Sequence, residues 1–211
     1  MKEMEKRFYT FNPSAEKRDD GTGRLTGHPI VYNSPTDIGG MFREVVMPGA
    51  LDGADLKDVP LLVNHNDRMI PVARSRRNNG NSTMILIPDG NGLGFDASLD
   101  IARNATASEL YSAVERGDID GMSFAFVVDD ERWEDLESEY PTRYINRFSM
   151  IREISAVTFP AYNTTDINAR SKDALESARA ALDSERRQKA SSAVDTADIE
   201  LARLRVKIKT L

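Results

Sequence analysis

The sequence predicts an α+β protein built as a β-barrel of short, mostly antiparallel strands surrounded by helices, with a helical C-terminal extension. Three observations lead to this prediction. Short stretches of β-branched and aromatic residues recur along the first 170 residues, separated by Gly, Pro, Asn and Asp. Two stretches among them carry helix-start signals, and the last 40 or so residues have a helix-forming composition. Many short strands with a few helices are typical of a closed sheet that carries its helices outside.

The expected strands are bounded by turn residues, and several of them alternate between apolar and polar side chains. Within the strand at residues 24–33, Pro29 indicates a sheet edge or a bulge, because proline has no N–H to donate. The strands are expected at residues 7–11, 24–33, 42–46, 59–65, 72–76, 83–87, 93–99, 121–128, 143–150 and 151–158.

At least two helices are expected within the first 170 residues. Pro48 precedes Gly49-Ala50-Leu51 and suits the first turn of a short helix. Thr106 and Glu109 have the spacing of a capping box, and Gly117 has the position of a C-terminal stop. Residues 129–140 are highly charged and are predicted to form a solvated loop or an excursion from the body.

The C-terminal region differs in composition from the rest. Residues 173–189 are rich in Ala, Leu, Arg and Glu and are predicted to be helical, with a break at 190–193 and a second helix at 196–209. The net charge is +2 for residues 171–211 and therefore −8 for residues 1–170. We accordingly expect two parts, a body at 1–170 and a helical tail at 171–211.

Composition excludes several classes of function. The chain has 211 residues, 40% of them hydrophobic, with no cysteine and only two histidines, so no disulfide, thiolate metal site or His-rich zinc site is expected. No cofactor is predicted. A net charge of −6 argues against nucleic acid as the main partner. No apolar run could span a membrane, and residues 1–7 lack the apolar core of a signal peptide, so we expect a soluble intracellular protein.

The strand at residues 121–128 carries the first candidate for chemistry. Strand geometry places the bulky Met122, Phe124 and Phe126 on one face, which we predict to be the core face. Ser123 lies on the opposite face among small residues, where another group has room to approach. A buried strand serine without a catalytic role is the alternative, because serine needs a base to become a nucleophile.

His65 is the best candidate for that base, and Glu153 for the group that orients it. His65 ends an apolar strand and precedes a polar turn, although a surface histidine would have the same context. Glu153 lies in the strand at 151–158, where a buried carboxylate needs a partner; the alternatives are an ion pair with arginine or exposure at a sheet edge. Weaker candidates for the orienting role are Asp96, Asp100 and Asp129, and His28 is interpreted as structural.

Four segments follow one another along the chain in a distinctive order: Glu44–Leu51, Leu61–Asn66, Gly121–Phe126 and Arg152–Tyr162. Together they resemble the tailed-phage prohead proteases, serine peptidases that mature capsids, and the resemblance covers about residues 23–168. It implies a fold like that of the herpesvirus capsid maturation protease (assemblin), whose barrel is ringed by helices.

The resemblance also implies the site residues: Ser123 as nucleophile, His65 as base and Glu153 as third member. The herpesvirus enzymes have a second histidine in the third position, and this chain departs from them there. Backbone N–H groups are expected to stabilise the oxyanion.

The function implied is that of a serine endopeptidase acting inside the immature capsid, in the cytoplasm of a bacterial host. Its substrates and partners would be the major capsid protein with its scaffolding segment, or a scaffold protein, and the protease itself. The resemblance thus implies a catalytic domain at 1–170 and a tail at 171–211 that contacts scaffold or is removed by self-cleavage. The oligomeric state is left open, with a homo-oligomer among the options. The alternative is a catalytically inactive capsid-assembly protein of the same fold.

Overall fold

The computed structural model describes residues 4–10, 13–158 and 175–191, and within these residues the strands form two sheets. One is seven-stranded, with the order β1-β10-β11-β5-β4 and with β6 and β7 attached beside β11. The other is four-stranded, with the order β2-β3-β9-β8. The first sheet consists of β1 (Glu5–Thr10), β4 (Thr36–Ile38), β5 (Phe42–Val46), β6 (Asp58–Val63), β7 (Ala73–Arg76), β10 (Gly121–Glu134) and β11 (Thr142–Val157). The second consists of β2 (Ser14–Lys17), β3 (Gly23–Val31), β8 (Met84–Asp89) and β9 (Gly92–Leu99).

The predicted α+β class is confirmed, but the sheets do not close into a barrel. Among the described strands, β7 and β8 belong to different sheets and share no ladder. They are connected next to β8, through Thr83: its N–H donates to the carbonyl of Arg74 at 3.0 Å, and its hydroxyl accepts the Arg74 N–H at 2.8 Å. Within the four-stranded sheet, the register of β3 against β9 shifts between Gly27 and Ile30, around Pro29. Proline has no N–H to donate to a ladder, so this point is a bulge, one of the two predicted alternatives, and β3 resumes its pairing with β9 at Ile30.

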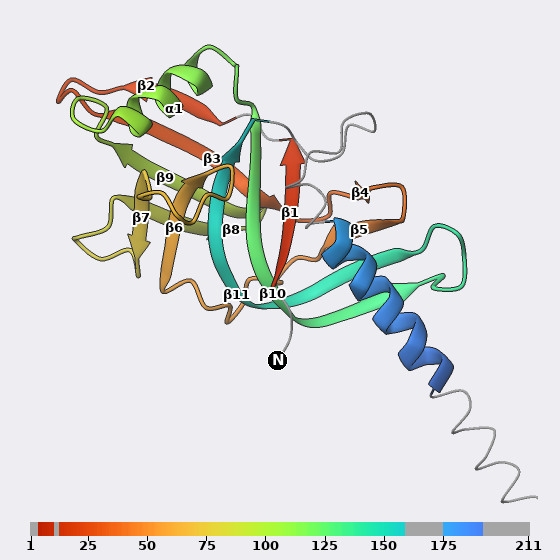
Figure 1. The fold of residues 1–211 in the computed structure, drawn as a ribbon. Helices are drawn as coiled ribbons and strands as arrows, with labels where there is room; N and C mark the ends of the chain where they lie inside the picture. The colour runs from red at the N-terminus through yellow and green to blue at the C-terminus, as the bar shows by residue number, and fades with distance from the viewer. Residues whose placement is uncertain (1–3, 11–12, 159–174, 192–211) are drawn as a thin grey trace, which may run out of the picture.

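A long bent hairpin, β10–β11, connects the body to an arm that extends to one side (Figure 1). Four register shifts along β10 mark bulges, which bend a strand and increase its twist. The prediction of a loop at 129–140 is therefore wrong for its first half, because β10 continues to Glu134. The predicted strands at 143–150 and 151–158 are one strand. Asp129 on β10 forms an ion pair with Arg147 on β11, so charged residues stabilise this exposed part of the ladder by pairing across the two strands.

One continuous apolar core lies between the sheets, and the predicted core face of β10 contributes to it. Met122, Phe124 and Phe126 are fully buried there. Phe124 and Phe126 pack around Phe148 of β11 with ring centroids 6.0 and 5.1 Å away. Aromatic rings in such edge contacts contribute more than their buried area alone.

The helix α1 (Ala105–Glu115) is capped differently from the prediction. Asn104, not Thr106, is the N-cap, and its side-chain oxygen accepts the N–H of Ala107 at 3.2 Å. Gly117 ends the helix as predicted, with a φ of +77°. The short helix predicted at Pro48 is absent, because Pro48–Gly53 forms consecutive turns in which Gly49 and Gly53 have positive φ.

A second helix, residues 175–191, lies along the arm (Figure 1). Ala178 and Leu182 pack with Phe42 and Leu136 in a separate apolar cluster, and Arg186 donates to the carbonyls of Leu136 and Ser138. The predicted helix at 173–189 is thus largely present. Three predictions lie outside the described residues: the boundary at 170, most of the break at 190–193, and the helix at 196–209. Neither helix in the described part of the chain is long and apolar enough to cross a bilayer.

Candidate active site

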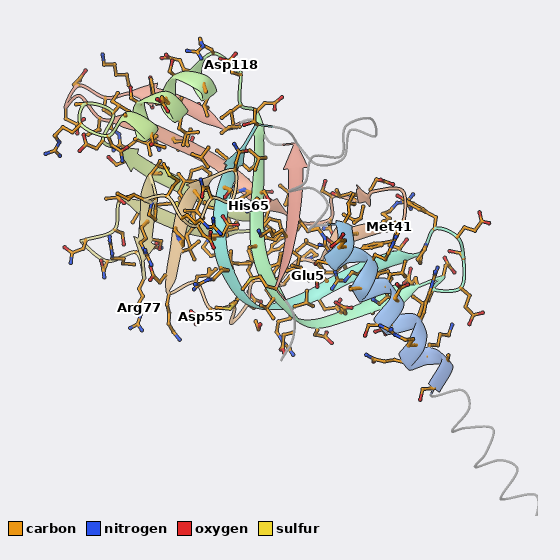
Figure 2. All side chains as sticks on the ribbon, viewed as in Figure 1. Glu5, Met41, Asp55, His65, Arg77 and Asp118 are labelled. Carbon is orange, nitrogen blue, oxygen red and sulfur yellow. The ribbon has the colours of Figure 1, made fainter. Side chains whose placement is uncertain are left out.

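His65 lies in a tight turn directly after β6. Both Asn64 and His65 have positive φ, at 52° and 54°, a backbone conformation that non-glycine residues rarely adopt. Two hydrogen bonds of Asn64 hold the turn to the end of β11: its N–H donates to the carbonyl of Ala156, and its side chain accepts the N–H of Thr158, directly after the strand, at 3.0 Å. The parallel pairing of β6 with β11 therefore fixes where the imidazole lies, near the centre of the molecule in Figure 2.

The structure brings His65 and Glu153 together. The imidazole Nδ1 hydrogen-bonds to Glu153 Oε1, and the two side chains are only 6% and 8% exposed. Ser155 lies between them: its hydroxyl donates to Glu153 Oε2 at 2.5 Å and accepts the backbone N–H of His65 at 3.2 Å. Glu153 and Ser155 are two apart on β11, so they share one face of the strand.

This arrangement decides the tautomer of the imidazole. A carboxylate only accepts hydrogen bonds, so the contact requires a proton on Nδ1. Neutral His65 then has its lone pair on Nε2, which is the nitrogen that can act as a base. The same contact stabilises the imidazolium that forms when Nε2 takes up a proton.

Ser123 lies on the neighbouring strand, directly opposite Ser155 in the antiparallel register of β10 and β11. Paired residues of a sheet point to the same face, so Ser123 shares the face of Ser155 and Glu153. It is fully buried, and its hydroxyl donates to the main-chain carbonyl of Arg7 on β1 at 2.6 Å. Its single proton therefore points at β1 in this structure.

A buried ionic cluster holds β1 in this position. The guanidinium of Arg7 donates to both oxygens of Glu44 at 2.7 and 2.9 Å. Arg143 donates to both oxygens of Glu5 at 2.6 and 2.7 Å, and also contacts Glu44 and Glu131. Burial by itself would raise the pKa of Glu5, but Arg7 and Arg143 outweigh that effect and lower it to about 2.

A pocket of about 400 Å³ opens beside His65 and Glu153. Met4 and Lys6, at the N-terminal end of the chain, form part of its wall together with Leu62 and Met69. The ion pair of Arg74 with Asp58 lies at the same pocket, with its closest atoms 2.6 Å apart. The pocket is therefore mixed in character, with apolar groups and charges of both signs next to the imidazole.

The weaker candidates for the orienting role lie elsewhere with other partners. Asp96 pairs with Arg24, Asp100 with Arg103, and Asp129 with Arg147. His28, on β3 in the other sheet, contacts Asp89 at 3.1 Å. The hydrogen bond between His28 and Asp89 is the largest influence lowering the pKa of that carboxyl.

Two residues at the site were not predicted from the sequence. Ser155 could have been found, because it lies two residues from Glu153 on a strand and so had to share its face. Arg7 could not, because its contact with Ser123 depends on how β1 pairs with β10, and no local pattern encodes that pairing.

Comparison with known proteins assigns the family. No curated protein and no solved structure matches the chain, so the expected relation to the herpesvirus protease stays a prediction. A model of the caudovirus prohead serine proteases matches residues 11–179, which contain His65, Ser123 and Glu153. The match covers most of the 211 residues, and the chain belongs to the caudovirus prohead serine protease family.

Proposed function

We propose that this chain is a serine endopeptidase that cleaves scaffold protein, or the scaffolding segment of the major capsid protein, and itself during prohead maturation. The observation that carries the proposal is the buried contact of His65 with Glu153, one strand away from Ser123. An imidazole oriented by a carboxylate beside a serine is the arrangement that acyl transfer requires.

In the proposed mechanism, Ser123 Oγ attacks the scissile carbonyl carbon while His65 Nε2 takes the hydroxyl proton. Glu153 stabilises the imidazolium, which then protonates the leaving amine as the C–N bond breaks. Water attacks the acyl-enzyme by the same route, and Ser123 regains its proton. Backbone N–H groups are proposed to stabilise the tetrahedral oxyanion.

The location, partners and tail follow from the same proposal. The enzyme would act inside the prohead in the cytoplasm of a bacterial host, with the capsid precursor as its partner and a homo-oligomer as one option for its assembly. Residues 171–211 would form a scaffold-contacting or removable tail after a catalytic domain at 1–170. Deleting residues 171–211 should prevent packaging into proheads, and normal packaging would contradict this role.

A catalytically inactive capsid-assembly protein is the second candidate. One observation favours it: Ser123 is fully buried and its proton is directed to Arg7. Such a protein would keep the fold and bind the capsid precursor without cleaving it.

Two measurements separate the candidates. Purified protein is treated with a fluorophosphonate probe, and in parallel it is incubated with the capsid precursor before mass measurement of the fragments. A peptidase should be labelled at Ser123 and should cleave the precursor, while Ser123→Ala should lose both activities.

The matched control is Ser149→Ala, which removes another cross-strand bond of a serine hydroxyl to a carbonyl, here that of Val127 at 3.2 Å. This control should cleave like the unaltered protein. Cleavage by Ser123→Ala at the unaltered rate would show that the nucleophile is wrongly assigned, and binding without cleavage would favour the inactive protein.

A further inference from the structure

Ser123 lies on β10, which pairs with β11 along one edge, and the N-terminal strand β1 covers its other edge. It runs antiparallel to β10, with Glu5 opposite Phe126 and Thr10 opposite Gly121, so it covers the whole stretch around the serine. Figure 1 shows β1 at the outer side of β10, with β11 on the other side. Ser123 is buried in this arrangement.

We propose that this edge of β10, at Gly121–Phe126, is the docking site for an extended substrate peptide, and that residues 5–10 of the chain occupy it as an internal competitor. This inference rests on the proposed function, because it takes Ser123 as the nucleophile. An extended peptide can add to a sheet edge through main-chain hydrogen bonds, and β1 does this here.

The contact between Arg7 and Ser123 supports this assignment. In the register of β1, the carbonyl that reaches the serine is that of Arg7, so the Arg7–Phe8 peptide bond lies where a scissile bond would lie. The contact is nevertheless unproductive, because the hydroxyl donates its proton to the carbonyl oxygen. Attack requires that proton on His65 and Oγ directed at the carbonyl carbon.

The ionic cluster explains why β1 stays in place. Removing β1 separates Arg7 from Glu44 and Glu5 from Arg143, which are pairs in a buried setting. Separating such a pair is costly, so β1 competes strongly with a substrate. The residues that match the family model begin at residue 11, so β1 lies outside the matched region.

The departure of β1 would also enlarge the neighbouring pocket. Met4 and Lys6 form part of the wall beside His65 and Glu153. Once they leave, the pocket and the free edge of β10 become continuous, which provides one surface for both the main chain and a side chain of a substrate.

A disulfide that locks β1 to β10 tests the proposal directly. The chain has no cysteine, so the double variant Thr10→Cys, Gly121→Cys forms one defined disulfide between residues paired in the register. Oxidised, it should react with the fluorophosphonate probe at least about tenfold more slowly than after reduction, because only the open fraction can react.

The control is the double variant Ser14→Cys, Thr26→Cys, which locks β2 to β3 in the other sheet in the same way. Its labelling rate should be independent of its redox state. Equal labelling of the oxidised and reduced forms of the β1–β10 variant would overturn the proposal.

A second measurement keeps the test valid even if that variant folds poorly. In the unaltered full-length protein the probe forms a bond between Ser123 Oγ and phosphorus, fluoride leaves, and the hydroxyl proton passes to His65. The phosphorus group then needs the space of the Arg7 carbonyl, so hydrogen exchange at the amides of residues 5–10 should accelerate. Labelled protein with unchanged protection at these amides would contradict the proposal. Failure of the probe to label both the unaltered protein and the reduced Thr10→Cys, Gly121→Cys variant would instead contradict the proposed function.

Discussion

At the scale of single residues, the site depends on a backbone conformation as much as on side-chain identity. Asn64 and His65 both adopt positive φ, and the Asn64 side chain and the Ser155 hydroxyl hold this turn by hydrogen bonds. Strained residues of this kind persist only where their surroundings fix them. The geometry of the candidate site therefore depends on Glu153 and Ser155 of β11 and on Thr158 directly after it.

Glu153→Gln should lower kcat on the capsid precursor by about 10³- to 10⁴-fold. The amide can donate a hydrogen bond to Nδ1 and so favour the wrong tautomer of His65, while its volume stays the same. The control Asp129→Asn changes a carboxylate that pairs with Arg147 and should leave kcat unchanged. If Asp129→Asn lost activity and Glu153→Gln did not, the orienting role would belong to Asp129.

Ser155→Ala should lower kcat by about tenfold to a hundredfold with KM nearly unchanged. The change removes the hydrogen bonds that hold the Glu153 carboxylate and the His65 backbone, so the imidazole loses its fixed position. Ser155→Thr keeps the hydroxyl and should restore most of the activity. A rise in KM at constant kcat, or no difference between Ala and Thr, would show that Ser155 has no positioning role.

At the scale of elements, the buried ionic cluster joins four strands at one point. Glu5 and Arg7 belong to β1, Glu44 to β5, Glu131 to β10 and Arg143 to β11. Glu44 opens one of the four segments that resemble the prohead proteases, and the structure shows its contacts: it binds Arg7 and Arg143. In this structure Glu44 therefore contributes to strand assembly and to the anchoring of β1.

The cluster predicts a specific loss of stability in acid. The pKa of Glu5 lies at about 2 in the folded protein against a model-peptide value of 4.5, so its contribution to stability is present above pH 4.5 and is lost as the pH falls towards 2. A shift of this size corresponds to about 3 kcal/mol. Urea denaturation at pH 6 and pH 3 should show about 2 kcal/mol of this loss in the unaltered protein, because Glu5 is still mostly ionised in the folded state at pH 3.

Glu5→Gln cannot titrate, so its free energy of unfolding should be lower at pH 6 and should fall less between pH 6 and pH 3. A fall as steep as that of the unaltered protein would show that Glu5 does not carry the acid dependence. The exposed ion pair of Arg103 with Asp100 offers a control, because Asp100→Asn should alter the stability at pH 6 by less than about 1 kcal/mol.

At the scale of the whole molecule, one core joins both sheets, while the arm has a small cluster of its own. Phe124 lies in the main core together with Leu25 of β3 and Phe95 of β9. Phe42 and Trp133 pack edge to face in the arm cluster, with their ring centroids 4.9 Å apart. Trp133 is the single tryptophan of the chain, so its fluorescence reports on the arm.

Phe124→Ala should lower the free energy of unfolding by about 3–5 kcal/mol, because it leaves a cavity at a fully buried position. The control Ile87→Ala changes a side chain that is 46% exposed and should alter stability by no more than about 0.5 kcal/mol. Circular dichroism during urea denaturation measures both variants. A loss below about 1 kcal/mol for Phe124→Ala would mean that the core rearranges around the gap.

The sequence by itself determined the positions of most strands, the core face of β10, the end of α1 at Gly117 and the family. The strand positions, the core face and the end of α1 follow from side-chain periodicity and local backbone preference, which act over a few residues. The family follows from the resemblance of four segments and from the family match. The length of the β10–β11 hairpin was missed, because its charged residues pair across strands and no local signal marks that pairing.

Only the tertiary structure decided that the strands form two sheets instead of a barrel, that Ser155 links His65 to Glu153, and that Arg7 reaches Ser123. Each of these depends on which strand edges meet and in which register, over separations of about 90 or more residues. Register is fixed by the packing of the whole core, because a shift by one residue would turn every side chain of a strand to the opposite face.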